Sequence, residues 1–570
     1  MHGAELLFAT LLGPMARATP LGRDSSRAAA ACDGRIVSSI VITPRDPSFL
    51  AIPRPLRPLA RGLGLLHTTS TAATIDRFLL LEVGQPCTER QRAESERILR
   101  AQPFLADADV RVVPDSAGRV GIEVETIDEI ATVLDVRFRN RRPSEVRFGN
   151  GNIGGLGLYA AASAEHASAY RTGFGIHGVA YQVFGQPYTL AVVAERSPLG
   201  GELTMELGHK FLTDLQRAAW HLGLRNVDGY VPFGPPEGDV LSLEVRRQLW
   251  DVGGVRRVEL GRRSAFVGGL ITHEAVTPAN RFVVVSDSGL VVGTGALLRE
   301  PAPGYRNLRL NAVAGVRALS FTEVRGFDAL TATQDVATGV QFGVLAGRSI
   351  PQFVGGDDDV FVSADLYAGR GSATSFGAMR IEAEARNDRG ANDWDSMIGS
   401  GRLAWYVKPA AAHVVIGSVE LAGGRRQRVP FQLLLGDRQG GVRGYSASRD
   451  AGAARGVVRL EERWSIGTLG SHAALGIASF ADAGRVWAGD APFGVNSSPK
   501  IGLGVGLLAA LPPQSQRLWR LDFAVPVSPD AHTRWEVRLT GIWTRAFWRE
   551  PDDVARGRAG AAPSTIFTWP

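Results

Sequence analysis

The chain has 570 residues, of which 45% are hydrophobic and 21% are charged, and this balance excludes an intrinsically disordered protein. Its formal net charge of +6 is spread along the sequence without a lysine/arginine block, so nucleic acid is not an expected partner. No stretch reaches the ~18 apolar residues of a membrane-spanning helix, but the short alternating strands of a membrane barrel would escape that criterion.

The first residues predict a leader segment. Residues 1–32 contain a short apolar stretch but lack a basic beginning, so they read as a poor signal peptide, with cleavage expected after Ala18 or Ala31. The sequence has two cysteines, Cys32 and Cys87. They are either unpaired or joined in one disulfide in an oxidising compartment.

Residues 33–131 differ in pattern from the rest and predict a small α+β unit of order β-α-α-β-β. The second helix begins with a capping-box pattern formed by Thr88 and Gln91. The proline- and arginine-rich residues 44–68 read as an insertion. The elements expected here are a strand at 34–43, helices at 70–86 and 88–104, and two strands within 108–128.

From about residue 132 onward alternation replaces any helical pattern. In residues 519–525, Trp519, Leu521, Phe523 and Val525 lie on one face, with Arg520 and Asp522 on the other. The same alternation recurs in residues 201–211, 239–250 and 534–548. In residues 239–250 it sets Leu241, Leu243, Val245 and Leu249 against Ser242, Glu244, Arg246 and Gln248.

Two architectures contain long alternating strands, a soluble sandwich and an outer-membrane barrel. Charged polar faces and turns that are alternately tight and long favour the barrel, with apolar side chains toward lipid and polar ones toward the lumen. At roughly 26 residues per strand and connection, residues 132–548 fit about 16 strands, with 14 or 18 as alternatives. Aromatic residues at strand ends also fit an interfacial girdle, namely Trp250, Trp487, Trp535, Phe547 and Trp548.

The sequence offers no catalytic constellation, so the protein is not expected to be an enzyme and no cofactor or metal is expected. It lacks the zinc-protease pattern HExxH and the G-x-S-x-G elbow, and its ten histidines are scattered. The glycines of residues 502–506 are read as strand positions that admit bulky neighbours in the lumen rather than as a nucleotide loop. Asp357–Asp359 are read as a solvated loop rather than a calcium site.

One constellation does carry a signal, and it begins with the tetrapeptide Val442–Tyr445. A strand follows in which Arg459, Glu461 and Arg463 share one face, and then a second strand in which Phe480, Asp482 and Gly484 share one face. The related tetrapeptide Val324–Phe327 has no such strands after it. An arginine between glycines, followed by carboxylates on one face, fits a guanidinium that holds those carboxylates.

This order of motifs resembles the Omp85 superfamily of outer-membrane proteins, which includes BamA-like, TamA-like, TpsB and D15 surface-antigen members. The resemblance implies a 16-stranded transmembrane barrel in which a loop tip, here Val442, Arg443, Gly444 and Tyr445, folds back into the lumen. It implies that Arg443 pairs with Asp482 and Glu461, and that Asp522 faces the lumen. It also implies that residues 33–131 form one POTRA-like periplasmic domain, while residues 549–570 form a C-terminal tail beyond the usual end of such barrels.

The function that this resemblance implies is the insertion or translocation of other polypeptides at the bacterial outer membrane without chemical catalysis. The expected partners are outer-membrane lipid and lipopolysaccharide, together with unfolded polypeptide clients bound through the POTRA-like domain. The alternative is a passive pore or structural surface-antigen barrel without clients, and a third reading is a soluble secreted β protein.

Overall fold

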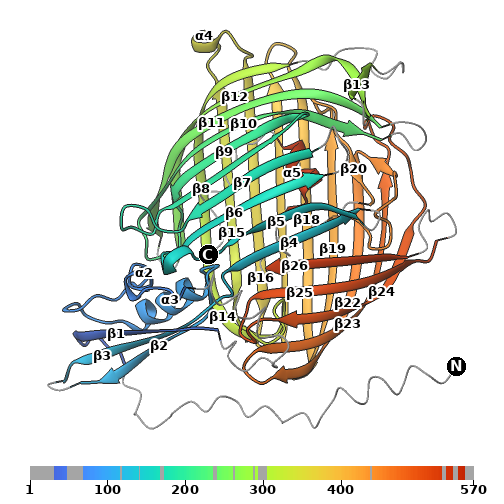
Figure 1. Ribbon diagram of the computed structural model, residues 1–570. Coiled ribbons are helices and arrows are strands. Elements are labelled where there is room, and N and C mark those ends of the chain that lie inside the picture. The colour runs from blue at the N-terminus through green and yellow to red at the C-terminus, as the bar shows by residue number, and fades with distance from the viewer. Residues whose placement is uncertain are drawn as a thin grey trace, which may run out of the picture.

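The computed structural model describes residues 31–47, 68–115, 118–139, 142–166, 172–234, 240–260, 263–286, 289–292, 304–436, 440–528, 535–543 and 550–558. A small N-terminal unit lies at one end of a large barrel of strands (Figure 1). The leader before residue 31, most of the insertion at 44–68, and the expected girdle residues Phe547 and Trp548 lie outside the described residues. Within them, no helix is long and apolar enough to cross a bilayer.

The N-terminal unit follows the predicted element order. Its elements are β1 (Val37–Arg45), α2 (Ala72–Asp76), α3 (Glu89–Arg100), β2 (Leu105–Pro114) and β3 (Val120–Asp128). The sheet has the order β1-β3-β2, with β1 parallel and β2 antiparallel to β3. Cys32 and Cys87 form a disulfide that joins the segment before β1 to the connection between the helices.

The two helices of this unit differ from expectation in length. The predicted capping box is present at α3, because the Thr88 side chain accepts from the Gln91 N–H and the Gln91 side chain accepts from the Thr88 N–H. Helix α2 ends at Asp76 instead of continuing to Gly84. Phe78 is buried in the core cluster, and the Leu80 N–H donates to the Ser95 side chain on α3. The apolar run after α2 is therefore held by α3 and the sheet rather than by helical hydrogen bonds.

The barrel is closed and antiparallel, and the described residues contribute 20 strands to its ring, with the short β13 paired only to the end of β12. The strands are β4 (Thr132–Arg139), β5 (Arg142–Asn150), β6 (Leu158–His166), β7 (Thr172–Ala180), β8 (Thr189–Ser197), β9 (Gly200–His209), β10 (Ala218–Phe233), β11 (Leu241–Leu260), β12 (Arg263–Ser286), β13 (Gly289–Val292), β14 (Tyr305–Arg325), β15 (Thr333–Ser349), β16 (Asp359–Gly371), β17 (Ser375–Asp388), β18 (Asp393–Ala410), β19 (His413–Arg425), β22 (Ala454–Leu469), β23 (Ala473–Trp487), β24 (Lys500–Ala510), β25 (Arg517–Pro526) and β26 (Glu536–Trp543).

The expectation of about 16 strands is therefore wrong. It assumed roughly 26 residues per strand and connection throughout. The six strands β4–β9 occupy only residues 132–209, because each has eight to ten residues and the connections between them are short. Among the described residues after 132, where no helix was expected, there are also three short helical segments: η3 (Ile153–Gly155), α4 (Pro351–Val354) and α5 (Asp552–Gly557).

The outside of the barrel is apolar and its inside is charged. On β25, Leu521 and Phe523 are each 43% exposed on the outer surface, whereas Arg520 and Asp522 on the alternate positions are about 5% exposed. Trp250, Trp487 and Trp535, three of the expected girdle residues, are also exposed. Such a distribution is the reverse of a water-soluble sandwich, whose apolar face points inward.

Strand β11 departs from the predicted faces. Leu241, Leu243 and Val245 are buried inside the barrel, while Arg246 faces outward. The first large apolar residues at outward positions are Trp250 and Val252, which are about 40% exposed. Because β11 has 20 residues, more than the ~9–11 that a bilayer requires, its first part extends beyond an apolar band and its alternation does not report on lipid contact there.

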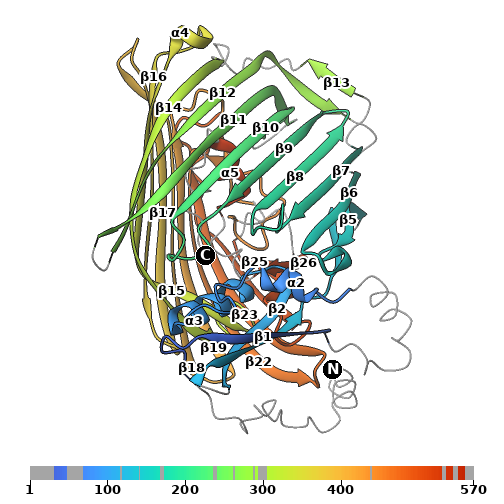
Figure 2. The same ribbon diagram turned by 90° about the vertical axis from the view of Figure 1, so that its left-hand side faces the viewer.

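The N-terminal unit contacts one end of the barrel (Figure 2). Arg100 at the end of α3 donates from Nε and Nη2 to the two carboxylate oxygens of Asp335 on β15, at 3.0 and 2.8 Å. Glu129, which follows β3, accepts a 2.7 Å hydrogen bond from the hydroxyl of Ser515 in the connection before β25. The unit therefore covers the end of the barrel that contains the start of β15 and the connection before β25.

Candidate functional site

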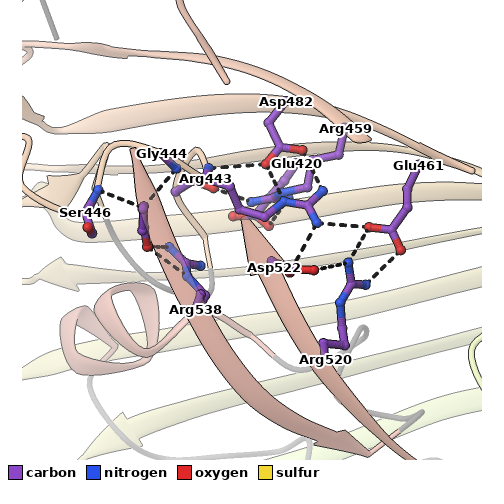
Figure 3. Close-up of polar contacts among 12 residues, drawn as sticks. Glu420, Arg443, Gly444, Ser446, Arg459, Glu461, Asp482, Arg520, Asp522 and Arg538 are labelled. Atoms are coloured by element: carbon purple, nitrogen blue, oxygen red, sulfur yellow. Dashed lines mark hydrogen bonds and ion pairs between the residues drawn. The ribbon is translucent and has the colours of Figure 1, made fainter. Parts of the chain in front are cut away.

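The site is built on the connection between β19 and β22, which folds into the barrel. A two-residue pair, β20 (Leu433–Leu434) with β21 (Ala451–Gly452), closes the base of this loop. In the predicted tip, Val442–Tyr445, the Arg443 side chain points toward Asp482 and Glu461 on the barrel strands (Figure 3). The anchors of the tip are apolar, since Val442 and Tyr445 are 0% and 3% exposed and pack in one cluster with Leu435, Val457 and Val486.

Arg443 at the tip is held mainly by Asp482 on β23. Its Nε and Nη2 donate to the two oxygens of that carboxylate at 2.7 and 2.8 Å, and its backbone N–H donates to Oδ2 at 3.2 Å. Its Nη1 donates to Glu461 on β22 at 2.9 Å. The guanidinium carbon lies 3.5 Å from the centroid of the Phe480 ring, so the cation is also covered by an aromatic face. This is the fixed multi-donor fork that only arginine supplies.

Glu461 connects this pair to two more arginines. It accepts from Arg463 Nε at 2.6 Å and from both terminal nitrogens of Arg520 at 2.7 and 2.9 Å. Arg520 also donates to Asp522 at 3.1 Å, and Asp522 lies 3.7 Å from Arg443 Nη1. Three arginines and three carboxylates thus form one connected network, in which each charge has a counter-charge within the lumen.

The backbone next to Arg443 is bound by a carboxylate that sequence reasoning did not identify. Glu536 on β26 accepts from the Gly444 N–H at 2.9 Å and from the Ser446 N–H at 3.4 Å. Gly444 has φ +93°, and a Cβ there would meet the backbone nitrogen of Pro526 at 3.2 Å. A glycine is therefore needed both for the turn and for its contact with β25. The alternation of residues 534–548 puts Glu536 on the polar face of its strand but does not indicate this contact.

The wall strands carry small residues where the loop lies on them. A Cβ on Gly502 would approach the Arg443 carbonyl oxygen to 2.1 Å, and one on Gly484 would approach the Val442 side chain to 2.7 Å. The glycines of residues 502–506 thus admit bulky lumen neighbours, in line with the reading of that stretch as a strand.

The other predicted lumen residues lie around the same loop. Arg459 donates to the carbonyl of Gly441 at 2.9 Å and to Glu420 at 3.4 Å, so it supports the loop rather than Arg443 itself. Arg463 donates to Glu461 and to the carbonyl of Asp328 at 2.8 Å. The structure therefore brings together all of the residues that the motif singled out.

The second tetrapeptide, Val324–Phe327, lies in a different environment. It forms the end of β14 and the turn to β15, at the end of the barrel that carries the N-terminal unit. The Arg325 side chain is exposed, while Phe327 is fully buried against Phe376 and Tyr406. Its turn contacts the main network where Arg463 donates to the carbonyls of Phe327 and Asp328.

A cavity of about 600 Å³ lies between the network and the N-terminal unit. Its lining combines Phe104 and Glu129 from the N-terminal side with Arg443, Glu461 and Asp552 from the lumen. The cavity therefore lies between the N-terminal unit on one side and the inward loop with Asp552 on the other.

Comparison with known proteins gave no matching family model and no matching curated protein. Solved structures similar to this chain include BamA from Haemophilus ducreyi lacking POTRA domains 1–3, at 12% identity and TM-score 0.34, covering 89% of this chain and 84% of that one. They also include CdiB from Acinetobacter baumannii, at 11% identity and TM-score 0.38, covering 88% and 73%. CdiB from Escherichia coli is 12% identical with TM-score 0.36 and covers 92% of both chains.

Proposed function

We propose that this chain is an Omp85-type protein of the bacterial outer membrane that inserts or translocates polypeptides without chemical catalysis. The observation that carries the proposal is the position of Arg443. The loop that carries it folds into the barrel, where Arg443 donates hydrogen bonds to Asp482 and Glu461. Paired buried charges hold this loop tip inside the lumen, which is the placement that the resemblance to the Omp85 superfamily implies.

The surface of the barrel supports a membrane location. Apolar side chains cover the outside and ion pairs fill the inside, which suits lipid around the ring and polar groups within it. We expect outer-membrane lipid and lipopolysaccharide to surround the apolar band, and the N-terminal unit to lie in the periplasm.

Two features suit polypeptide clients. The three-stranded sheet of the N-terminal unit has β1 and β2 as its edges, and a sheet edge can pair with an incoming strand. Among the described residues, the ring is closed by β26 and β4 with eight residues each, whereas β11, β12 and β14 have 20 to 24. A seam between two short strands has fewer hydrogen bonds to break, so we propose that the barrel opens there toward the bilayer.

Depletion of the protein followed by proteomics of the outer membrane tests this function. If clients depend on it, other barrel proteins or secreted polypeptides should decline, and wild-type protein but not Arg443→Ala should restore them. Arg325→Ala, in the second tetrapeptide, is the matched control and should restore them fully. An unchanged outer-membrane proteome after depletion would reject the proposal in favour of a passive or structural barrel.

A further inference from the structure

The chain does not end at the barrel wall. After β26 ends at Trp543, residues 550–558 lie inside the ring, and both views place α5 within the barrel (Figures 1 and 2). We call residues 550–558 the tail segment. Its position is not that of a surface appendage, because its contacts reach the lumen side of β11, β17, β18 and β22.

One ion pair fixes the tail segment to the wall. Asp553 is bound by both terminal nitrogens of Arg455 on β22, with Nη2 to Oδ1 at 3.2 Å, and the two side chains are 0% and 1% exposed. Asp553 also accepts from the Leu434 N–H at 3.2 Å. Leu434 belongs to β20, the base of the loop that carries Arg443. A single carboxylate of the tail segment therefore binds both the wall and the inward loop.

An apolar contact accompanies this ion pair. Val554 is fully buried in one cluster with Ile398, Ala422, Phe431 and Leu433, which come from β18, β19 and the inward loop. Further along, Arg558 lies 3.5 Å from Glu382 and 2.9 Å from Glu550, while the carbonyl of Arg556 accepts from Arg247 at 2.8 Å. These contacts spread over opposite parts of the ring and so place the segment across the lumen.

The composition of the tail segment differs from that of a permanent core element. Val554 is its one large aliphatic residue, whereas Glu550, Asp552, Asp553, Arg556 and Arg558 are charged. A segment of this kind is stable in the lumen through paired charges and is equally soluble in water once released. The tail segment therefore resembles a bound ligand, held by ion pairs and one buried valine, more than a strand of the barrel wall.

We propose that the tail segment is a built-in plug that closes the lumen and latches the inward loop, and that it must leave for the conduit to open. The proposal rests on the proposed function as a polypeptide conduit. Asp552 lines the 600 Å³ cavity, so the segment forms part of the boundary of this cavity. Its release would remove that part of the boundary and free the base of the loop at Leu434 together.

The test compares single-channel conductance in planar bilayers for the full-length wild type, Asp553→Ala, and a protein truncated after residue 549. We expect the truncated protein to conduct several-fold more than the wild type, and Asp553→Ala to switch between the two levels. Arg556→Ala is the matched control, because its side chain is exposed and its carbonyl contact to Arg247 is retained, so it should behave as wild type. Heat-modifiable migration of each variant verifies that its barrel is folded.

A labelling experiment separates failure of the plug from failure of the conduit. Val554→Cys supplies one free thiol, since Cys32 and Cys87 are paired. A membrane-impermeant maleimide should label it poorly in otherwise wild-type protein and at least several-fold faster when Asp553→Ala is added. Equal conductance of all variants, or rapid labelling of Val554→Cys without Asp553→Ala, would overturn the plug. Absence of channels from every variant would count against the conduit, and the labelling then decides the plug by itself.

Discussion

Removal of either member of the Arg443–Asp482 pair should strand a charge inside the barrel, and the two costs should differ. Asp482 is 0% exposed at its side chain and receives three donors from Arg443, so Arg443→Ala leaves a carboxylate deprived of its two guanidinium donors. Loss of one partner of a buried pair costs about 3–5 kcal/mol. In Asp482→Ala, Arg443 keeps Glu461 and borders the 600 Å³ cavity, so we expect a smaller cost of about 1–3 kcal/mol.

A double-mutant cycle measures this coupling. The free energy of unfolding in detergent is determined for wild type, both single variants and the double variant, and loop position is followed by maleimide labelling of Ser446→Cys in intact cells. The double variant should be little worse than Arg443→Ala, because it removes both charges together. Arg325→Ala should change neither measurement, since that side chain is exposed. Additive effects of Arg443→Ala and Asp482→Ala, or a larger effect of Arg325→Ala, would refute the assignment of Arg443 as the buried arginine.

Three further predictions concern the barrel and the N-terminal unit. Unboiled protein should migrate differently from boiled protein on a detergent gel, because a closed ring of strands has no free edge from which to unzip; identical migration would reject the barrel. The Cys32–Cys87 disulfide closes a separation of 55 residues, so Cys87→Ser should destabilise the N-terminal unit by about 2–4 kcal/mol in urea unfolding, and two free thiols in unreduced wild type would exclude the bond. Burial raises the pKa of Asp128 and that of Glu129 to about 7, above ordinary carboxyl values near 4. Both groups bind protons more tightly when folded, so their contribution is complete below about pH 4 and is lost as the pH rises through 7. The unit should thus resist protease better at pH 5 than at pH 8, and Asp128→Asn should weaken this dependence.

The parts of the fold that depend on neighbours in sequence were predictable. The capping box at Thr88 and the shared inward face of Phe480, Asp482 and Gly484 follow from spacings of two or three residues, and the structure has both. The number of strands does not follow from spacing, because strand length here varies from 8 residues in β4 to 24 in β12. An estimate based on a mean length per strand therefore predicted too few strands.

In the candidate site, too, the features set by sequence spacing were predictable and the others were not. Alternation places Arg520, Asp522 and Glu536 on an inward face, but it does not say which inward residues meet across the lumen. The choice of Asp482 and Glu461 as partners of Arg443 came from family resemblance, whereas the role of Glu536 at the Gly444 N–H had no counterpart in the quoted motifs. Partners on different strands are set by register and by the path of the loop, which periodicity leaves open.

The tail segment illustrates this limit in terms of charge. Arg402, Arg455 and Arg459 come from two strands and converge on one carboxylate, that of Glu420. Charges buried in a lumen are stable only where counter-charges meet them, so a group of three arginines around one glutamate favours any further carboxylate within reach. Asp553 supplies it, although it follows the last strand and lies 98 positions beyond Arg455 in the sequence. Residues 549–570 read as a C-terminal tail because they follow the aromatic residue that ordinarily ends such a barrel. What binds Asp553 inside the barrel is an excess of positive charge on strands far away in the chain.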